Sequence, residues 1–208
     1  MGELKLVLVD PITRLCEALK AAFDQLPNVT LVNGRFEELP KYDCMVSAAN
    51  SFGLMDGGVD AAITRFFGAG LMEKVQAHIL AEYLGEQPVG TSFIVETGNV
   101  KHPFLAHTPT MRVPMEIAHT DNVYLAMSAM LRAVFHHNRR AEKPINIIAC
   151  PGLGTATGNV PFREAARQMA LAYRNFLNPP AYLDWRLADA RQLEIRFGGD
   201  MGLHLPTD

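Results

Sequence analysis

Hydrophobic positions along the chain fall into two alternating patterns, short apolar runs and longer stretches with a helical period. The apolar runs predict strands over residues 4–9, 29–32, 44–50, 91–96, 104–108 and 145–150. The helical period predicts helices over residues 15–23, 60–67, 71–84, 122–137 and 162–177. Strands and helices follow one another along most of the chain, which indicates an α/β protein.

Length and composition favour one domain. The chain has 208 residues, of which 49% are apolar, and this is enough to bury a core without disulfides. We expect a single domain over residues 1–208, with a core over about 4–177 and a C-terminal extension over about 178–208. The extension follows Pro179 and Pro180 and contains the single tryptophan, Trp185. Its sequence has no period that predicts a helix or strand.

Charge, hydropathy and cysteine usage indicate which partners and which cellular compartment to expect. The 19 basic and 22 acidic side chains give a net charge of −3, so a nucleic-acid-binding surface is not expected. No apolar run approaches the ~20 residues that span a membrane. The cysteines Cys16, Cys44 and Cys150 are widely spaced and odd in number, which predicts reduced thiols in the cytoplasm. Neither a metal nor a cofactor is predicted, and we expect a monomer.

Two glycine-rich loops each follow a predicted buried strand, over residues 51–59 and 152–159. Glycines at such places expose backbone N–H groups beside a helix start, which favours a phosphate or diphosphate. Ligands of open α/β sheets bind at the carboxyl ends of the strands. Neither loop has a standard nucleotide motif, so ordinary ATPase and dehydrogenase functions are not indicated. The alternative is that each loop is only a tight turn.

Three motifs resemble those of a known family. They are Val46-Ser-Ala-Ala-Asn50, Gly57-Gly58-Val59-Asp60-Ala-Ala-Ile63, and Gly154-Thr-Ala-Thr-Gly158 shortly before Pro161. Their order and spacing resemble the macrodomain family of ADP-ribose-binding modules, in particular its divergent bacterial and phage branch, over about residues 4–177. The resemblance implies a three-layer α/β/α sandwich with a central mixed sheet. It also implies a cleft at one end of that sheet, which binds ADP-ribose or an ADP-ribosylated protein.

The resemblance further implies roles for individual residues. Asn50 would bind the distal ribose, and Asp60 would position or deprotonate water, so these two are the expected catalytic residues. The implied ligand-binding residues are Phe36, Ala49, Asn50, Gly57, Gly58, Val59, Gly154, Thr155, Ala156, Thr157 and Gly158. Two positions depart from the family pattern. Arg35 replaces an Asp that binds adenine, which leaves adenine to the backbone or ring of Phe36, and Thr157 replaces a frequent aromatic residue.

Both expected catalytic residues have an alternative structural role. Asn50 ends a strand, where an Asn side chain commonly bonds its own following turn. Asp60 lies at a predicted helix start, where the helix dipole favours an acid and is expected to keep it ionised. The function expected from the resemblance is hydrolysis of an ADP-ribosyl linkage. Alternatives are an ADP-ribose 1″-phosphate phosphatase, an O-acetyl-ADP-ribose deacylase, a non-catalytic ADP-ribose reader, and an interaction domain with a decayed cleft.

Overall fold

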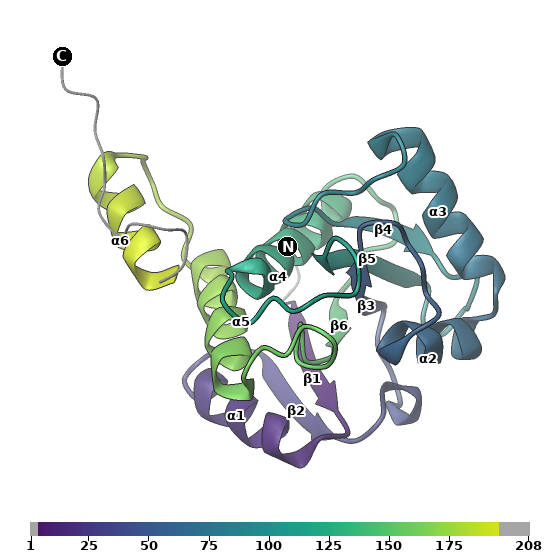
Figure 1. The fold of residues 1–208 in the computed structure, drawn as a ribbon, viewed down its shortest axis with the longest axis horizontal. Helices are drawn as coiled ribbons and strands as arrows, with labels where there is room; N and C mark the ends of the chain where they lie inside the picture. Colours follow the sequence, from purple (N-terminus) through teal and green to yellow (C-terminus); the bar gives the residue numbers. More distant parts are fainter. Residues whose placement is uncertain (1–3, 196–208) are drawn as a thin grey trace.

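A mixed six-stranded sheet forms the centre of the molecule in a computed structural model, which describes residues 4–195 (Figure 1). The strand order is β2-β1-β6-β3-β5-β4, and β4 at one edge is antiparallel to β5, whereas the other neighbouring pairs are parallel. The strands are β1 (Lys5–Asp10), β2 (Val29–Asn33), β3 (Cys44–Asn50), β4 (Phe93–Glu96), β5 (Phe104–Met111) and β6 (Ile147–Cys150).

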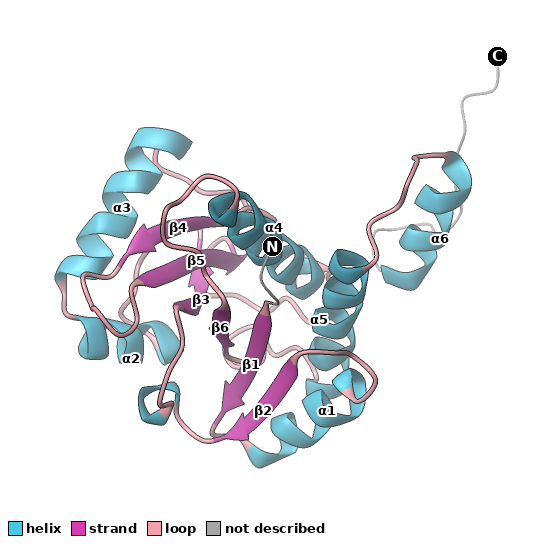
Figure 2. Cartoon of the chain, turned by 180° about the vertical axis from the view of Figure 1, so that it is seen from behind, coloured by secondary structure: helices cyan, strands magenta, loops and turns pink. Residues whose placement is uncertain are grey.

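Helices cover both faces of the sheet and complete the three layers (Figure 2). They are α1 (Thr13–Phe23), the 3-10 turn η1 (Phe36–Glu38), α2 (Gly58–Phe67), α3 (Gly70–Tyr83), α4 (Asn122–Asn138), α5 (Phe162–Leu177) and α6 (Trp185–Ile195). One core cluster joins α1, α4 and α5 to residues such as Leu8 and Val46, and a second joins η1, α2 and α3 to residues such as Met45. Alternate residues of the strands therefore enter opposite cores.

The predicted strands and helices all form, with differences at some ends. β5 continues through Pro109 to Met111, because every residue of this strand is buried beside β3. α2 begins at Gly58 rather than Asp60, which places Asp60 within the first turn of the helix. Among residues 4–195, no helix is long and apolar enough to cross a membrane.

The C-terminal extension contains a helix that the hydrophobic pattern did not predict. α6 stands apart from the sheet and meets the body near α5 (Figures 1 and 2). Arg167 of α5 donates hydrogen bonds to the carbonyl oxygens of Glu194 and Ile195, at 2.7 and 3.1 Å. None of the residues of α6 is buried, so the helix has no apolar period to reveal it.

The topology brings several strand ends together. β1, β3, β5 and β6 run parallel and adjacent, so that their carboxyl ends meet at one edge of the sheet. Asp10, Asn50, Met111 and Cys150 are the last residues of these strands. The two glycine loops leave this edge, which is the usual place for a ligand in such sheets.

Candidate functional site

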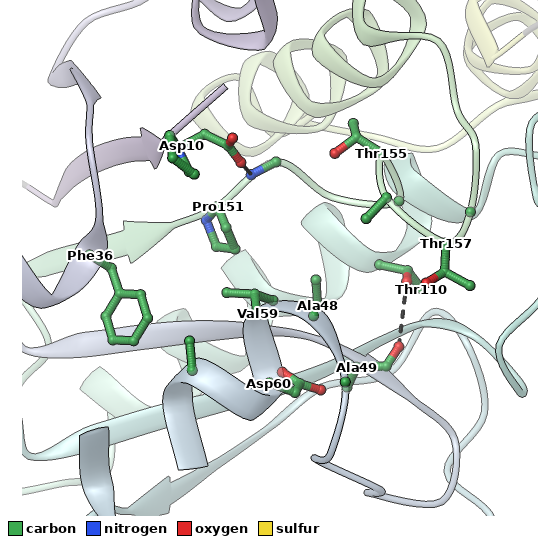
Figure 3. Close-up of a pocket in the computed structure, with 18 of the residues that line it drawn as sticks. Asp10, Phe36, Ala48, Ala49, Val59, Asp60, Thr110, Pro151, Thr155 and Thr157 are labelled. Carbon is green, nitrogen blue, oxygen red and sulfur yellow. Dashed lines mark hydrogen bonds between the residues drawn. The ribbon is translucent and has the colours of Figure 1, made fainter. Parts of the chain in front are cut away.

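A cleft of about 400 Å³ lies at this edge of the sheet (Figure 3). Every residue that the sequence pointed to lines it, although the role of each remains a prediction. These residues are Phe36, Ala49, Asn50, Gly57, Gly58, Val59, Asp60, Gly154, Thr155, Ala156, Thr157 and Gly158. The first loop with α2 and the second loop lie on opposite sides of the cleft in the close-up view (Figure 3).

The side chain of Asn50 holds the first glycine loop in shape. Its Oδ1 accepts hydrogen bonds from the backbone N–H groups of Phe52 and Leu54, at 3.1 and 3.3 Å. Its Nδ2 donates to the carbonyl oxygen of Leu54 at 2.8 Å. Asn50 thus makes the local turn contacts that are common for an Asn at a strand end, while it also lines the cleft.

Asp60 is buried beneath the first loop. The residue is only 5% exposed, and its Oδ1 accepts a hydrogen bond of 2.7 Å from the hydroxyl of Ser47 on β3. Burial raises the pKa of Asp60 to about 7, although the Ser47 hydrogen bond opposes this. From the helix start alone we expected an ionised Asp60, but burial of the carboxyl group favours its neutral form and leaves it only partly ionised at neutral pH.

The second glycine loop is tightly packed at all three of its glycines, Gly152, Gly154 and Gly158. A Cβ on Gly158 would lie 2.5 Å from the carbonyl oxygen of Gly154. A Cβ on Gly154 would lie 2.8 Å from Val123, and Gly154 also has a φ of +70°. The loop is closed by hydrogen bonds from Val160 N–H to Gly154 and from Asn159 N–H to Ala156. Glycine is thus required here for close backbone packing.

Backbone N–H groups without partners line both sides of the cleft. In the described part of the chain, the N–H groups of Gly58, Val59 and Asp60 donate no hydrogen bond, as expected for the first turn of a helix. The same holds for the N–H groups of residues 155–158 in the second loop. Such groups attract anions, and two sets of them on residues that line one cleft suit a diphosphate.

Asp10 is a cleft residue that the sequence did not single out. It ends β1 and is 8% exposed. Its two carboxylate oxygens accept hydrogen bonds from the N–H groups of Ile12 and Gly152, at 3.0 and 3.2 Å, and burial raises its pKa. Asp10 thus ties the second loop to β1 at the end of the cleft where Phe36 lies (Figure 3). Its only sequence signal is an acid at the end of a strand, followed by Pro11.

Further charged and apolar residues of the cleft come from segments that the motifs do not cover. Arg35, Glu37, Asp56 and Arg65 line it, together with Thr110 and Met111 at the end of β5. Phe36 is only 5% exposed, and the edge of its ring meets Phe66 at a centroid distance of 5.6 Å. Within residues 4–195, no group of three His, Cys, Asp or Glu side chains is arranged to hold a metal ion.

Comparisons with known proteins agree with this geometry. The sequence model of the Macro domain family matches residues 46–169. An uncharacterized protein of Aquifex aeolicus is 33% identical over 72% of this chain and 82% of its own length. A point mutant of the Oceanobacillus iheyensis macrodomain, solved with ADPR, matches with a TM-score of 0.61 and 18% identity over 94% of each chain. The macrodomain of Mycobacterium tuberculosis DarG matches with a TM-score of 0.59 and 18% identity, over 70% of this chain and 90% of that one.

Proposed function

Because this chain belongs to the macrodomain family, we propose that it binds ADP-ribose in the cleft and hydrolyses an ADP-ribosyl linkage. The observation that carries the proposal is the pair of unpartnered N–H sets, at residues 58–60 and 155–158, on the two sides of one cleft. A diphosphate between them would receive hydrogen bonds from both. The same fold in a macrodomain solved with ADPR supports this ligand.

The two ends of the cleft suit the two ends of ADP-ribose. With the diphosphate between the loops, the adenosine would lie towards Phe36 and Asp10, and the distal ribose towards Asn50. Phe36 lines the cleft at the first end. At the second end, the Asn50 amide has two N–H hydrogens, of which the Leu54 carbonyl takes one. The other would donate to a ribose hydroxyl.

Asp60 would assist the attack of water on the anomeric carbon of the distal ribose. As the water oxygen bonds to that carbon, the bond to the linked group breaks, and the water proton passes to the Asp60 carboxylate. A pKa of about 7 leaves Asp60 partly ionised at neutral pH, which suits a group that accepts and returns a proton. Such a base typically contributes ~10²–10⁴-fold to the rate. The carboxylate and the diphosphate of the ligand would also stabilise positive charge on the ribose.

A non-catalytic reader is the second candidate function, and two observations favour it. The Asp60 carboxyl is nearly inaccessible and bonded to Ser47. The Asn50 side chain already makes three hydrogen bonds within its own loop. Both residues would then stabilise the cleft without taking part in a reaction.

Calorimetric titration with ADP-ribose tests binding, and product analysis tests hydrolysis. The substrates are an ADP-ribosylated carboxylate peptide, ADP-ribose 1″-phosphate and O-acetyl-ADP-ribose, each with the wild-type protein and with Asp60→Asn. Turnover of the peptide by the wild type and its loss in Asp60→Asn, with ADP-ribose affinity retained, supports the hydrolase. Binding without turnover of any substrate supports the reader. Turnover of only the phosphate or the acetyl ester would identify one of the alternative enzymes, and no binding of millimolar ADP-ribose would remove the proposal.

A further inference from the structure

Asp56 has an unusual position in the cleft. It lies on the loop between β3 and α2, immediately before Gly57, and it is exposed. In the described part of the chain, no hydrogen bond or ion pair involves its carboxylate. The two buried carboxyl groups of the cleft differ, because Asp10 accepts two backbone N–H groups and Asp60 accepts the Ser47 hydroxyl. Asp56 therefore presents an unpaired negative charge to the cleft.

Two arginines of the cleft are the cations that could pair with Asp56. Arg35 and Arg65 both line the cleft, but within residues 4–195 neither forms a salt bridge with Asp56. The negative charge of Asp56 also acts on Asp60, which lines the cleft, because it contributes to the raised pKa of Asp60. A carboxylate at this place repels any further anionic group brought near it.

The placement of Asp56 determines which part of a ligand would meet this charge. In the proposed binding mode, Asn50 contacts the distal ribose, and the N–H groups at residues 58–60 contact the diphosphate. Asp56 lies on the cleft loop between these two contacts, so we place it at the distal-ribose end. Glu37 is the other carboxylate of the cleft that forms no hydrogen bond or ion pair with the described residues. It follows Phe36 and so lies at the adenosine end.

We propose that Asp56 makes the cleft selective by charge, disfavouring ADP-ribose derivatives with an anionic group on the distal ribose and accepting those whose linked group is neutral or cationic. This inference rests on the proposed function and narrows it. It assigns the protein to conjugates in which the linked side chain is neutral or cationic once attached, such as an ester of a carboxylate, rather than to phosphate monoesters. Discrimination by a repulsive charge is a general route to specificity.

Calorimetric titrations with two ligands test the proposal. ADP-ribose and ADP-ribose 1″-phosphate differ by the phosphate on the distal ribose, and each is titrated into the wild type, Asp56→Asn and Glu37→Gln. We expect the wild type to bind the 1″-phosphate at least tenfold more weakly than ADP-ribose. Asp56→Asn should reduce this ratio at least fivefold, whereas Glu37→Gln, which removes a charge at the other end, should leave it within twofold. Because salt screens exposed charges, the effect of Asp56→Asn should shrink at 1 M salt.

Each result decides between clear alternatives. A wild type that binds both ligands equally, or an Asp56→Asn variant that keeps the wild-type ratio, overturns the role of Asp56 while the proposed ADP-ribose site stands. No binding of either ligand by the wild type overturns the proposed function itself, and this inference with it. Asp56→Ser provides a second neutral variant, so that a folding defect in one substitution does not decide the outcome. Agreement between the two variants supports the charge effect.

Discussion

The hydroxyl of Ser47 donates a hydrogen bond of 2.7 Å to Oδ1 of Asp60, and both residues are buried. This contact joins the middle of β3 to the first turn of α2 under the first glycine loop. A buried carboxyl group with one hydroxyl partner favours its neutral form. The same pair therefore affects both the protonation state of the proposed catalytic base and part of the stability of the protein.

The pKa of Asp60 predicts a loss of stability as the pH rises. Its pKa is about 7 in the folded state and near 3.8 in the unfolded chain, so the unfolded state releases its proton first. The contribution of Asp60 is complete below pH 4 and lost as the pH rises through about 7. Asp60→Asn should remove this loss. The free energy of unfolding of the variant, relative to that of the wild type, should therefore increase by about 3 kcal/mol between pH 4.5 and pH 8. Urea denaturation at both pH values measures it.

The control for that measurement is Glu17→Gln, because Glu17 is an exposed carboxylate on α1. It should change the free energy of unfolding by less than about 0.5 kcal/mol at either pH. If the Asp60→Asn difference is the same at pH 4.5 and pH 8, Asp60 is ionised to the same extent in the folded and unfolded protein, and burial does not raise its pKa.

His107 predicts a separate loss of stability in acid. It is fully buried on β5, its Nδ1 lies 2.6 Å from Oε1 of Gln87, and its Nε2 has no partner among the described residues. Because Oε1 is an acceptor, Nδ1 carries a proton. Burial lowers the pKa of His107 to about 3. The stability that the neutral ring provides is present above about pH 6.5 and is lost as the pH falls towards 3.

The test compares His107→Leu with wild type by urea denaturation at pH 6.5 and pH 5. The wild-type protein should lose about 1.5 kcal/mol more than the variant over this interval. His119→Leu, at an exposed histidine, should follow the wild-type pH dependence. Parallel curves for His107→Leu and wild type would show that His107 is also protonated in the folded state over this range.

Packing around Gly158 predicts that even a methyl group is not tolerated there. A Cβ at this position would lie 2.5 Å from the Gly154 carbonyl oxygen and 2.8 Å from Ile117, and the backbone oxygen cannot move away as a flexible side chain could. Gly158→Ala should lower the free energy of unfolding by about 2 kcal/mol. It should also weaken ADP-ribose binding at least tenfold, because the second loop must shift. Gly57→Ala, where a Cβ meets nothing within 4 Å, should cost less than about 0.5 kcal/mol. Equal stabilities of the two variants would contradict the packing argument.

The sequence predicted the strands, most helices and the two loops because each has a local signature. Apolar runs and helical periods depend on neighbours in the chain, and the cleft follows from strand ends that such runs locate. The hydrogen-bond partner of Asp60 was not predictable in this way, since Ser47 lies thirteen residues earlier, on β3. The role of Asp10 depends on Gly152, which β1 and β6 bring together from opposite ends of the chain. α6 was missed because it buries no residue and so leaves no periodic pattern.

Gly58 allows a test of the cleft that assumes no chemistry. It lines the cleft at the start of α2, a Cβ there would meet no atom within 4 Å, and its φ is +53°. Any other residue is strained by about 1 kcal/mol in that conformation, so Gly58→Ala and Gly58→Glu should be destabilised alike by that amount. Only Glu adds volume and negative charge where the diphosphate would lie. Calorimetry should therefore show at least a tenfold loss of ADP-ribose affinity for Gly58→Glu and less than a threefold loss for Gly58→Ala. Equal affinities would mean that the ligand does not pass this loop.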